Sequence, residues 1–156
     1  MTKLTANFTL AEFTASDTAN ELGIKNTPTR DELANIITVA ERLQGLRDFL
    51  NSSLKTPVWL QITSGFRCEA LNAAVGGAPA SDHRSGLAAD FKAWRADGRA
   101  ISPDTLMRTV EALGSFDQAI RYDGQTRIHV GYGPKMRGQM LRKSGAGYEP
   151  YGGGAG

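Results

Sequence analysis

The feature that most constrains the fold is a run of apolar residues at helical spacing in the first third of the chain. The apolar positions recur every three or four residues and are Leu33, Ile36, Ile37, Ala40, Leu43, Leu46 and Leu50. This spacing predicts one amphipathic helix that extends to about residue 51. Its start has two candidate signals, Thr27-Pro28 as N-cap and first helical residue, and Thr29-x-x-Glu32 as a capping box. We expect this to be the main core helix, because its apolar stripe needs a partner surface.

The remainder of the chain is dominated by short strands. Val58, Leu60 and Ile62 alternate with other residues and predict a half-buried strand. The other predicted elements are a short helix (67–75), a loop of small and polar residues (76–88), a strand (89–94), a helix (102–113) and two strands joined by a hairpin at Asp123-Gly124 (116–122 and 127–132). This order predicts an α+β fold with an antiparallel sheet and flanking helices. Trp59 and Trp94 lie in the predicted strands, and we expect both in the core.

Length and composition exclude several classes of protein. A chain of 156 residues corresponds to one domain, which we place at 1–143, followed by a Gly-rich mobile tail at 144–156. The formal charge of +2 does not predict a nucleic-acid or membrane partner, and the single cysteine, Cys68, excludes a disulfide framework and a cysteine-cluster metal site. No apolar run is long enough to span a bilayer. The N-terminal residues lack the apolar core of a signal peptide, so we expect a cytoplasmic protein as synthesised.

The two histidines of the chain stand in informative places. His83 lies in the small-residue loop, Asp90 opens a strand seven residues later, and His129 lies within the second strand of the hairpin. Two imidazoles and one carboxylate form the protein ligand set of many catalytic zinc sites, which leave one coordination position open. The alternative is that each histidine is a structural or surface residue and that Asp90 is a strand-edge carboxylate.

The motif around these residues resembles a known family. The string Ser81-Asp-His-Arg-Ser-Gly-Leu-Ala-Ala-Asp90, with Ser64-Gly-Phe-Arg67 before it and Ile128-His-Val130 after it, is similar to the M15 zinc peptidases. This group contains D-alanyl-D-alanine carboxypeptidases and phage L-alanyl-D-glutamate endopeptidases, and the resemblance extends from about Phe8 to Tyr132. The opening Asn-Phe-Thr-Leu-Ala-Glu-Phe and Leu71-Asn-Ala-Ala-Val-Gly-Gly77 resemble the phage-type branch.

The resemblance implies a fold, a cofactor and a set of site residues. The fold would be of the Hedgehog/DD-peptidase type, and Zn²⁺ would be bound by His83, Asp90 and His129. Arg67 would hold a substrate carboxylate or polarise the scissile carbonyl, since a guanidinium offers a fixed fork of donors. Ser81 would be a polar substrate-binding position beside the site. The competing interpretations are a helix-start salt bridge for Arg67 and a loop residue for Ser81.

The implied activity is zinc-dependent hydrolysis of peptide bonds in peptidoglycan stem peptides, of the endolysin or the carboxypeptidase kind. We expect a monomer that acts on the cell wall after lysis or delivery. Residues 121–143 hold six basic residues and one acid. This basic stretch is either a solvated face or a surface that steers the protein to an anionic cell-wall polymer.

One position departs from the family pattern. The general-base glutamate of characterised members corresponds here to Thr126, and the glutamate of the phage-like branch corresponds to Tyr122. The nearest carboxylates that could act as general base are Asp123 and Asp117, although Asp123 could instead serve only the turn, and Asp117 could be a sheet-end carboxylate. The alternative function is therefore a catalytically weak or inactive zinc-fold module of a phage particle.

Overall fold

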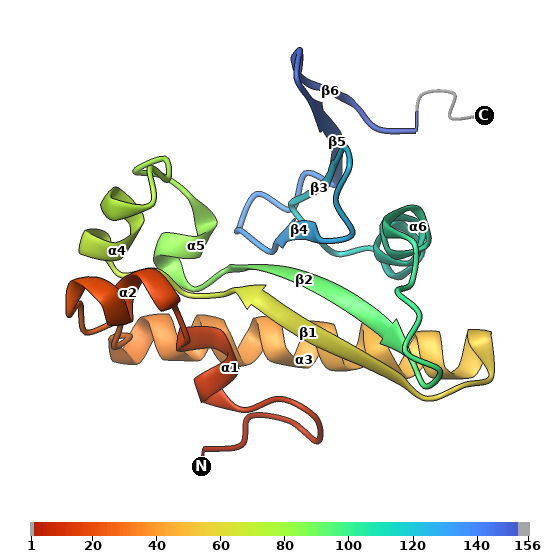
Figure 1. The fold of residues 1–156 in the computed structure, drawn as a ribbon, viewed down its shortest axis with the longest axis horizontal. Helices are drawn as coiled ribbons and strands as arrows, with labels where there is room; N and C mark the ends of the chain where they lie inside the picture. Colours follow the sequence, from red (N-terminus) through yellow and green to blue (C-terminus); the bar gives the residue numbers. More distant parts are fainter. Residues whose placement is uncertain (1, 153–156) are drawn as a thin grey trace.

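The computed structural model describes residues 2–152 and shows an α+β fold (Figure 1). The helices are α1 (Leu10–Thr14), α2 (Asp17–Leu22), α3 (Arg30–Leu54), α4 (Glu69–Ala74), α5 (Asp82–Ser85) and α6 (Pro103–Leu113). The strands are β1 (Val58–Ser64), β2 (Ala88–Arg95), β3 (Gln118–Tyr122), β4 (Ile128–Gly131), β5 (Gln139–Ser144) and β6 (Gly147–Pro150). The predicted fold class is confirmed. Among residues 2–152, no helix is both long and apolar enough to cross a membrane.

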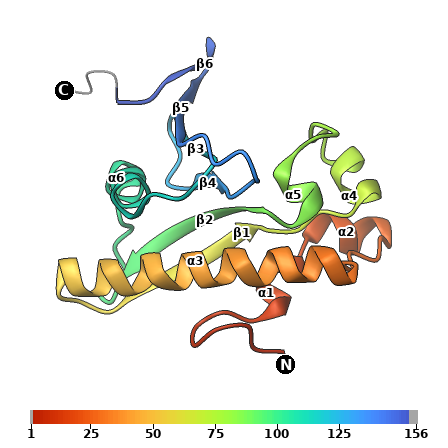
Figure 2. The same ribbon diagram turned by 180° about the vertical axis from the view of Figure 1, so that it is seen from behind.

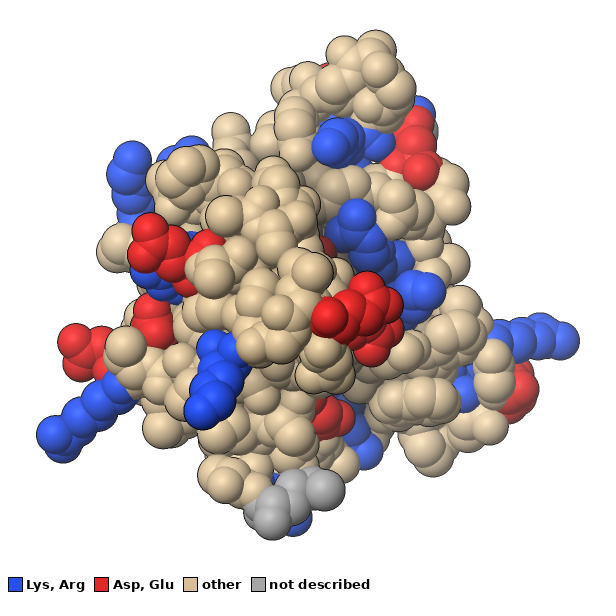
Figure 3. Space-filling view, turned by 60° about the vertical axis from the view of Figure 1, so that its left-hand side comes forward, with Lys and Arg blue, Asp and Glu red and all other residues tan. Residues whose placement is uncertain are grey.

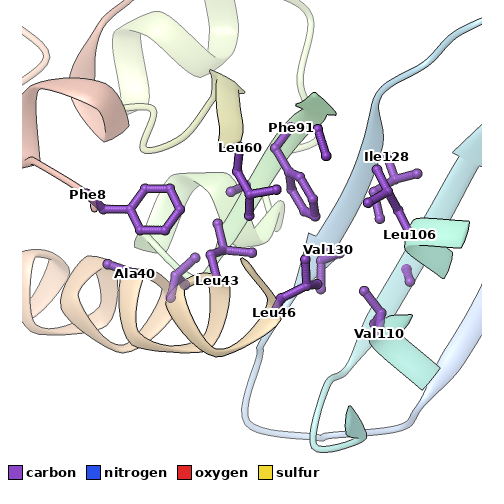
Figure 4. Packing of buried hydrophobic residues seen from close by; sticks show 14 of the residues in the cluster. Phe8, Ala40, Leu43, Leu46, Leu60, Phe91, Leu106, Val110, Ile128 and Val130 are labelled. Carbon is purple, nitrogen blue, oxygen red and sulfur yellow. The ribbon is translucent and has the colours of Figure 1, made fainter. Parts of the chain in front are cut away.

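The long helix α3 is the predicted core helix. It begins after Thr29, and the capping box is the signal that sets this start, because Glu32 N–H donates to Thr29 Oγ1 and Thr29 N–H donates to Glu32 Oε1. The alternative start at Thr27-Pro28 is wrong, and the helix extends to Leu54 rather than 51. In Figures 1 and 2, α3 runs along one side of β1 and β2. Its buried stripe meets Leu60 and Phe91 of these strands in the core shown in Figure 4.

The sheet contains six strands in the order β1-β2-β4-β3-β5-β6. Its neighbours are antiparallel except for β3 and β5, which pair in parallel, so the predicted antiparallel sheet contains one parallel pair. Residues 132–138 connect β4 to β5 and return the chain to the end of the sheet at which β3 begins. The predicted helix 102–113 and the hairpin at Asp123-Gly124 are confirmed as α6 and the β3–β4 turn.

The segment predicted as a Gly-rich tail continues the sheet. Ser144 ends β5, and β6 pairs with β5 in an antiparallel hairpin that projects away from α3 in Figures 1 and 2. Tyr151 follows β6, and its hydroxyl donates to Asp104 Oδ1 of α6 at 2.6 Å. The prediction was wrong as far as residue 152, because backbone pairing with β5 orders a sequence that is poor in apolar residues. Residues 153–156 of the predicted tail lie outside the described residues.

Two further local predictions need correction. The predicted loop 76–88 contains the short helix α5, because Ser81 caps its first turn and Gly86 ends it in the left-handed conformation. Trp59 is 58% exposed rather than buried, since the alternation along β1 places Val58 and Leu60 toward α3 and therefore Trp59 on the opposite face. Its ring lies 5.9 Å from that of its cross-strand neighbour Trp94.

Candidate metal centre and cleft

Three separate elements bring the predicted metal ligands together. His83 lies on α5, Asp90 on β2 and His129 on β4. Asp90 and His129 are directly opposite in the antiparallel pair of β2 and β4, so their side chains share one face of the sheet. The backbone N–H of Arg67 donates to the carbonyl of His83 at 3.0 Å, which ties α5 to the end of β1. The site is therefore assembled by the sheet register and by one short helix docked on it.

The ligand atoms of the three residues point at one place. His129 Nδ1 lies 2.9 Å from Asp90 Oδ1 and 3.2 Å from His83 Nε2, and His83 Nε2 lies 3.2 Å from Asp90 Oδ1. Tetrahedral ligands bound at about 2.0–2.1 Å lie about 3.3–3.4 Å apart, so the observed separations of 2.9–3.2 Å are slightly shorter than in a zinc site and bring the three atoms close enough to share one ion. All three residues are buried. Three buried donor atoms that converge in this way are typical of a metal site.

Neighbouring groups hold these ligands in position. The carbonyl oxygen of Gly65 lies 2.7 Å from His83 Nδ1, which assigns the ring proton to Nδ1 and leaves the lone pair of Nε2 for a metal. Arg127 Nη1 donates to Asp90 Oδ2 at 3.0 Å and leaves Oδ1 directed at the histidines. Burial alone would raise the pKa of Asp90, but the neighbouring His129 and His83 side chains outweigh it and lower this pKa well below its usual value. Asp90 is therefore an anionic ligand.

The ligand set opens into a cleft of about 760 Å³ that is also lined by Arg67 and Ser81. Arg67 lies between β1 and α4, and its Nε donates to Ser64 Oγ at 3.3 Å. Among residues 2–152 no carboxylate lies within ion-pair distance of Arg67, so the structure does not support the helix-start salt bridge. Burial lowers the pKa of this guanidinium, whose charge nevertheless persists because its pKa is normally above 12. Ser81 Oγ accepts the N–H of His83 and thereby acts as the α5 cap.

The two carboxylates predicted as general-base candidates are both held by arginines. Asp117 lies in the cleft wall, where Arg137 binds it through two parallel hydrogen bonds of 2.8 and 3.0 Å. Asp123 is exposed at the β3–β4 turn, does not line the cleft and is bound by Arg142 and Arg121. The hydrogen bonds from these arginines lower the pKa of each aspartate. The structure therefore brings Asp117 to the cleft, whereas it leaves Asp123 outside.

A different carboxylate lies beside the ligands. Asp82 lines the cleft, and its Oδ2 approaches Gly131 and Gly133, where an added Cβ would lie 2.7 and 2.9 Å from it. Within the described part of the chain Asp82 has no arginine or lysine partner. Burial, and next the charge of Asp117, raise the pKa of Asp82. Sequence reasoning missed this residue and Arg127, although Asp82 stands between the two motif residues Ser81 and His83.

The comparisons with known proteins agree with this geometry. Residues 6–131 match the family model described as Peptidase M15, a range that contains His83, Asp90, His129 and Arg67. No curated protein matches the chain in sequence. The matched range covers most of the chain and ends at the last residue of β4. With a buried His-Asp-His group that fits a zinc ion, the chain belongs to the peptidase M15 family and is a metallopeptidase.

Proposed function

We propose that the protein is a zinc-dependent peptidase that hydrolyses peptide bonds in the stem peptides of peptidoglycan. The observation that carries this proposal is the convergence of His83, Asp90 and His129 at the wall of an open cleft that also holds an unpaired arginine. The M15 family supports the peptidase activity, and the resemblance to its cell-wall members supports the substrate. The masses of the released fragments distinguish a carboxypeptidase from an endopeptidase.

The residues of the cleft have separate roles in the proposed hydrolysis. Zinc held by His83, Asp90 and His129 would activate water and polarise a carbonyl group. Arg67 has the properties needed to hold a substrate carboxylate or a developing oxyanion, because it is half-buried, charged and unpaired. Of the cleft carboxylates, Asp82 is the one without a cationic partner, so we assign to its Oδ2 the role of general base in place of Asp123. Burial raises the pKa of Asp82, which makes its carboxylate a stronger base than that of a solvated aspartate.

The test of the proposed function is mass spectrometry of digested muropeptides. Purified peptidoglycan is incubated with zinc-loaded protein, with chelator-treated protein and with two matched variants, Asp90→Asn and Asp97→Asn. Asp97 is an exposed aspartate whose one ion-pair partner among residues 2–152 is Arg99, so its variant controls for the change of charge. We expect products from the wild type and from Asp97→Asn alone, and the masses name the bond that is cut. Intact muropeptides in every sample would contradict the proposal.

An inactive zinc-binding module is the second candidate function. The observation that favours it is that Thr126 is exposed in the β3–β4 turn and cannot accept a proton as the family's glutamate does, while Asp117 and Asp123 are occupied by arginines. Under this alternative, the wild type retains one zinc ion per chain and sediments with peptidoglycan but releases no fragment. Release of peptidoglycan fragments that depends on zinc and on Asp90 would reject this second candidate function.

A further inference from the structure

A row of alternating cationic and aromatic side chains extends from the metal ligands to the C-terminal hairpin. Tyr122, Lys143 and Tyr148 are direct neighbours across β3, β5 and β6, which places their side chains on one face of the sheet. Arg127 lies 3.9 Å from the centre of the Tyr122 ring, and Lys143 Nζ lies 5.2 Å from the centre of the Tyr148 ring. All four residues line the same cleft as the metal ligands.

The charges in this cleft do not balance. Its basic side chains are Arg67, Arg127, Lys135, Arg137 and Lys143, and its carboxylates are Asp82, Asp90 and Asp117. Asp90 and Asp117 form ion pairs with Arg127 and Arg137. Within the described part of the chain this leaves one cleft carboxylate, Asp82, and three cleft cations, Arg67, Lys135 and Lys143, without an ion-pair partner. Figure 3 shows blue side chains gathered beside a hollow below the projecting hairpin. A ligand that fits this cleft must therefore be anionic.

Lys143 differs from the other basic residue beside it on β5. Arg142 is bound by Asp123 and Glu149, whereas Lys143 has no carboxylate within 4.0 Å among residues 2–152. Adjacent residues of a strand point to opposite faces. Lys143 therefore points into the cleft, and the ion-paired Arg142 points away from it. Tyr148, whose ring lies next to this ammonium group, is 58% exposed. A free cation beside an exposed aromatic ring is suited to a carboxylate carried on a small organic group.

We propose that Lys143 and Tyr148 of the β5–β6 hairpin, together with Tyr122 and Arg127, form a subsite that binds a carboxylate-bearing part of the peptide substrate away from the metal. The proposal rests on the proposed function and deepens it, because it defines the substrate as an anionic peptide with a second carboxylate beyond the one that Arg67 can hold. Tyr122 and Arg127 lie within residues 6–131, which match the peptidase M15 family, whereas Lys143 and Tyr148 lie in the hairpin that follows this range.

Each member of the row has a separate task in this subsite. The Lys143 ammonium group donates charge-assisted hydrogen bonds to the carboxylate, and the Tyr148 ring packs against the adjoining carbon atoms. Burial, and next the charge of Asp90, raise the pKa of Tyr122 to about 12, so its hydroxyl keeps its proton and remains a donor. Arg127 joins the subsite to the metal centre, since it contacts both the Tyr122 ring and Asp90.

The test compares two synthetic stem peptides that differ only in charge. One has free carboxylates and the other carries carboxamides in their place, and in both the bond that the wild type cuts is replaced by a reduced CH₂–NH bond. If the wild type cuts no bond, the unmodified peptides are used. Binding to the zinc-loaded protein is measured by calorimetry for the wild type, Lys143→Gln, Lys143→Arg and Arg142→Gln. Arg142→Gln is the matched control because it removes a cation from the same strand on the other face.

We expect Lys143→Gln to weaken binding of the carboxylate peptide by about three- to tenfold and to leave binding of the carboxamide peptide within twofold. Lys143→Arg should restore most of the loss, and Arg142→Gln should bind both peptides as the wild type does. Equal effects of Lys143→Gln on both peptides, or none on either, would overturn the subsite. A charge-selective loss in a protein that cuts no peptide would support the subsite and reject the proposed function, so the two failures are distinguishable.

Discussion

The side chain that most directly controls the metal ligands without binding the metal is Arg127, and its replacement by glutamine is the sharpest test of the site. Asp90 uses Oδ1 toward both histidines, and its Oδ2 is held by Arg127 alone among the described residues. Without this contact, the buried carboxylate keeps an oxygen without a partner and is free to rotate away from the ligand geometry. Arg127→Gln should therefore weaken zinc binding.

The expected loss of zinc affinity can be taken from other metal sites in which a hydrogen bond to a ligand has been removed. Loss of a hydrogen bond to a ligating group typically lowers metal affinity by about 10- to 100-fold, which is about 1.4–2.7 kcal/mol. With zinc in excess, this is also the loss of stabilisation by bound metal, because only the folded chain brings His83, Asp90 and His129 together. For a chain of this length, the melting temperature in zinc should fall by about 3–10 °C more than it does in chelator.

The assay is competition for zinc with a chromophoric chelator, combined with melting curves in zinc and in chelator. Arg142→Gln is the control, since Arg142 binds Asp123 and Glu149 at the surface and touches no ligand. The opposing effect is charge repulsion, because the Arg127 guanidinium lies 3.0 Å from a carboxylate that would bind a dication. Zinc affinity of Arg127→Gln equal to or higher than that of the wild type would show that repulsion outweighs positioning and would refute the reasoning.

Three further predictions concern catalysis and stability. Arg67→Lys keeps the charge but loses the two-pronged fork, so kcat/KM should fall at least tenfold, about 1.4 kcal/mol, with zinc content unchanged by elemental analysis. Asp82→Asn should lower kcat by about 10² to 10⁴ while Asp123→Asn retains turnover, and the reverse order in a steady-state assay would return the base to Asp123. Asp117 has a lowered pKa because of its hydrogen bonds from Arg137. It therefore stabilises the fold above about pH 4 and loses this contribution as the pH falls through the folded-state value, so the melting-temperature gap between wild type and Asp117→Asn should close toward low pH.

The proposed general base is a residue that could not be chosen from the sequence alone. The sequence favours Asp123 because it adjoins Tyr122, the position of the phage-branch glutamate, but Asp123 lies at the exposed β3–β4 turn and does not line the cleft. Asp82 could have been considered, since it stands within the zinc motif itself. Its exposure to the cleft depends on the one-turn helix α5, which was predicted as loop. The direction in which Asp82 points depends on the residues against which α5 packs, because the helix propensity of four residues does not fix the position of so short a helix.

The sequence by itself determined the elements whose signals are local, and it singled out the three residues that the structure brings together as a group that could hold a metal ion. The α3 stripe, the Ser102-Pro103 cap and the Asp123-Gly124 hairpin depend on neighbouring residues, and each reappears in the structure. Only the tertiary structure decided how strands far apart in the chain pair. The parallel contact of β5 with β3, which carries Lys143 to Tyr122, has no local signal. It is made by backbone hydrogen bonds, which any sequence can form, and its register follows from how the 132–138 connection and the β5–β6 hairpin pack on the sheet.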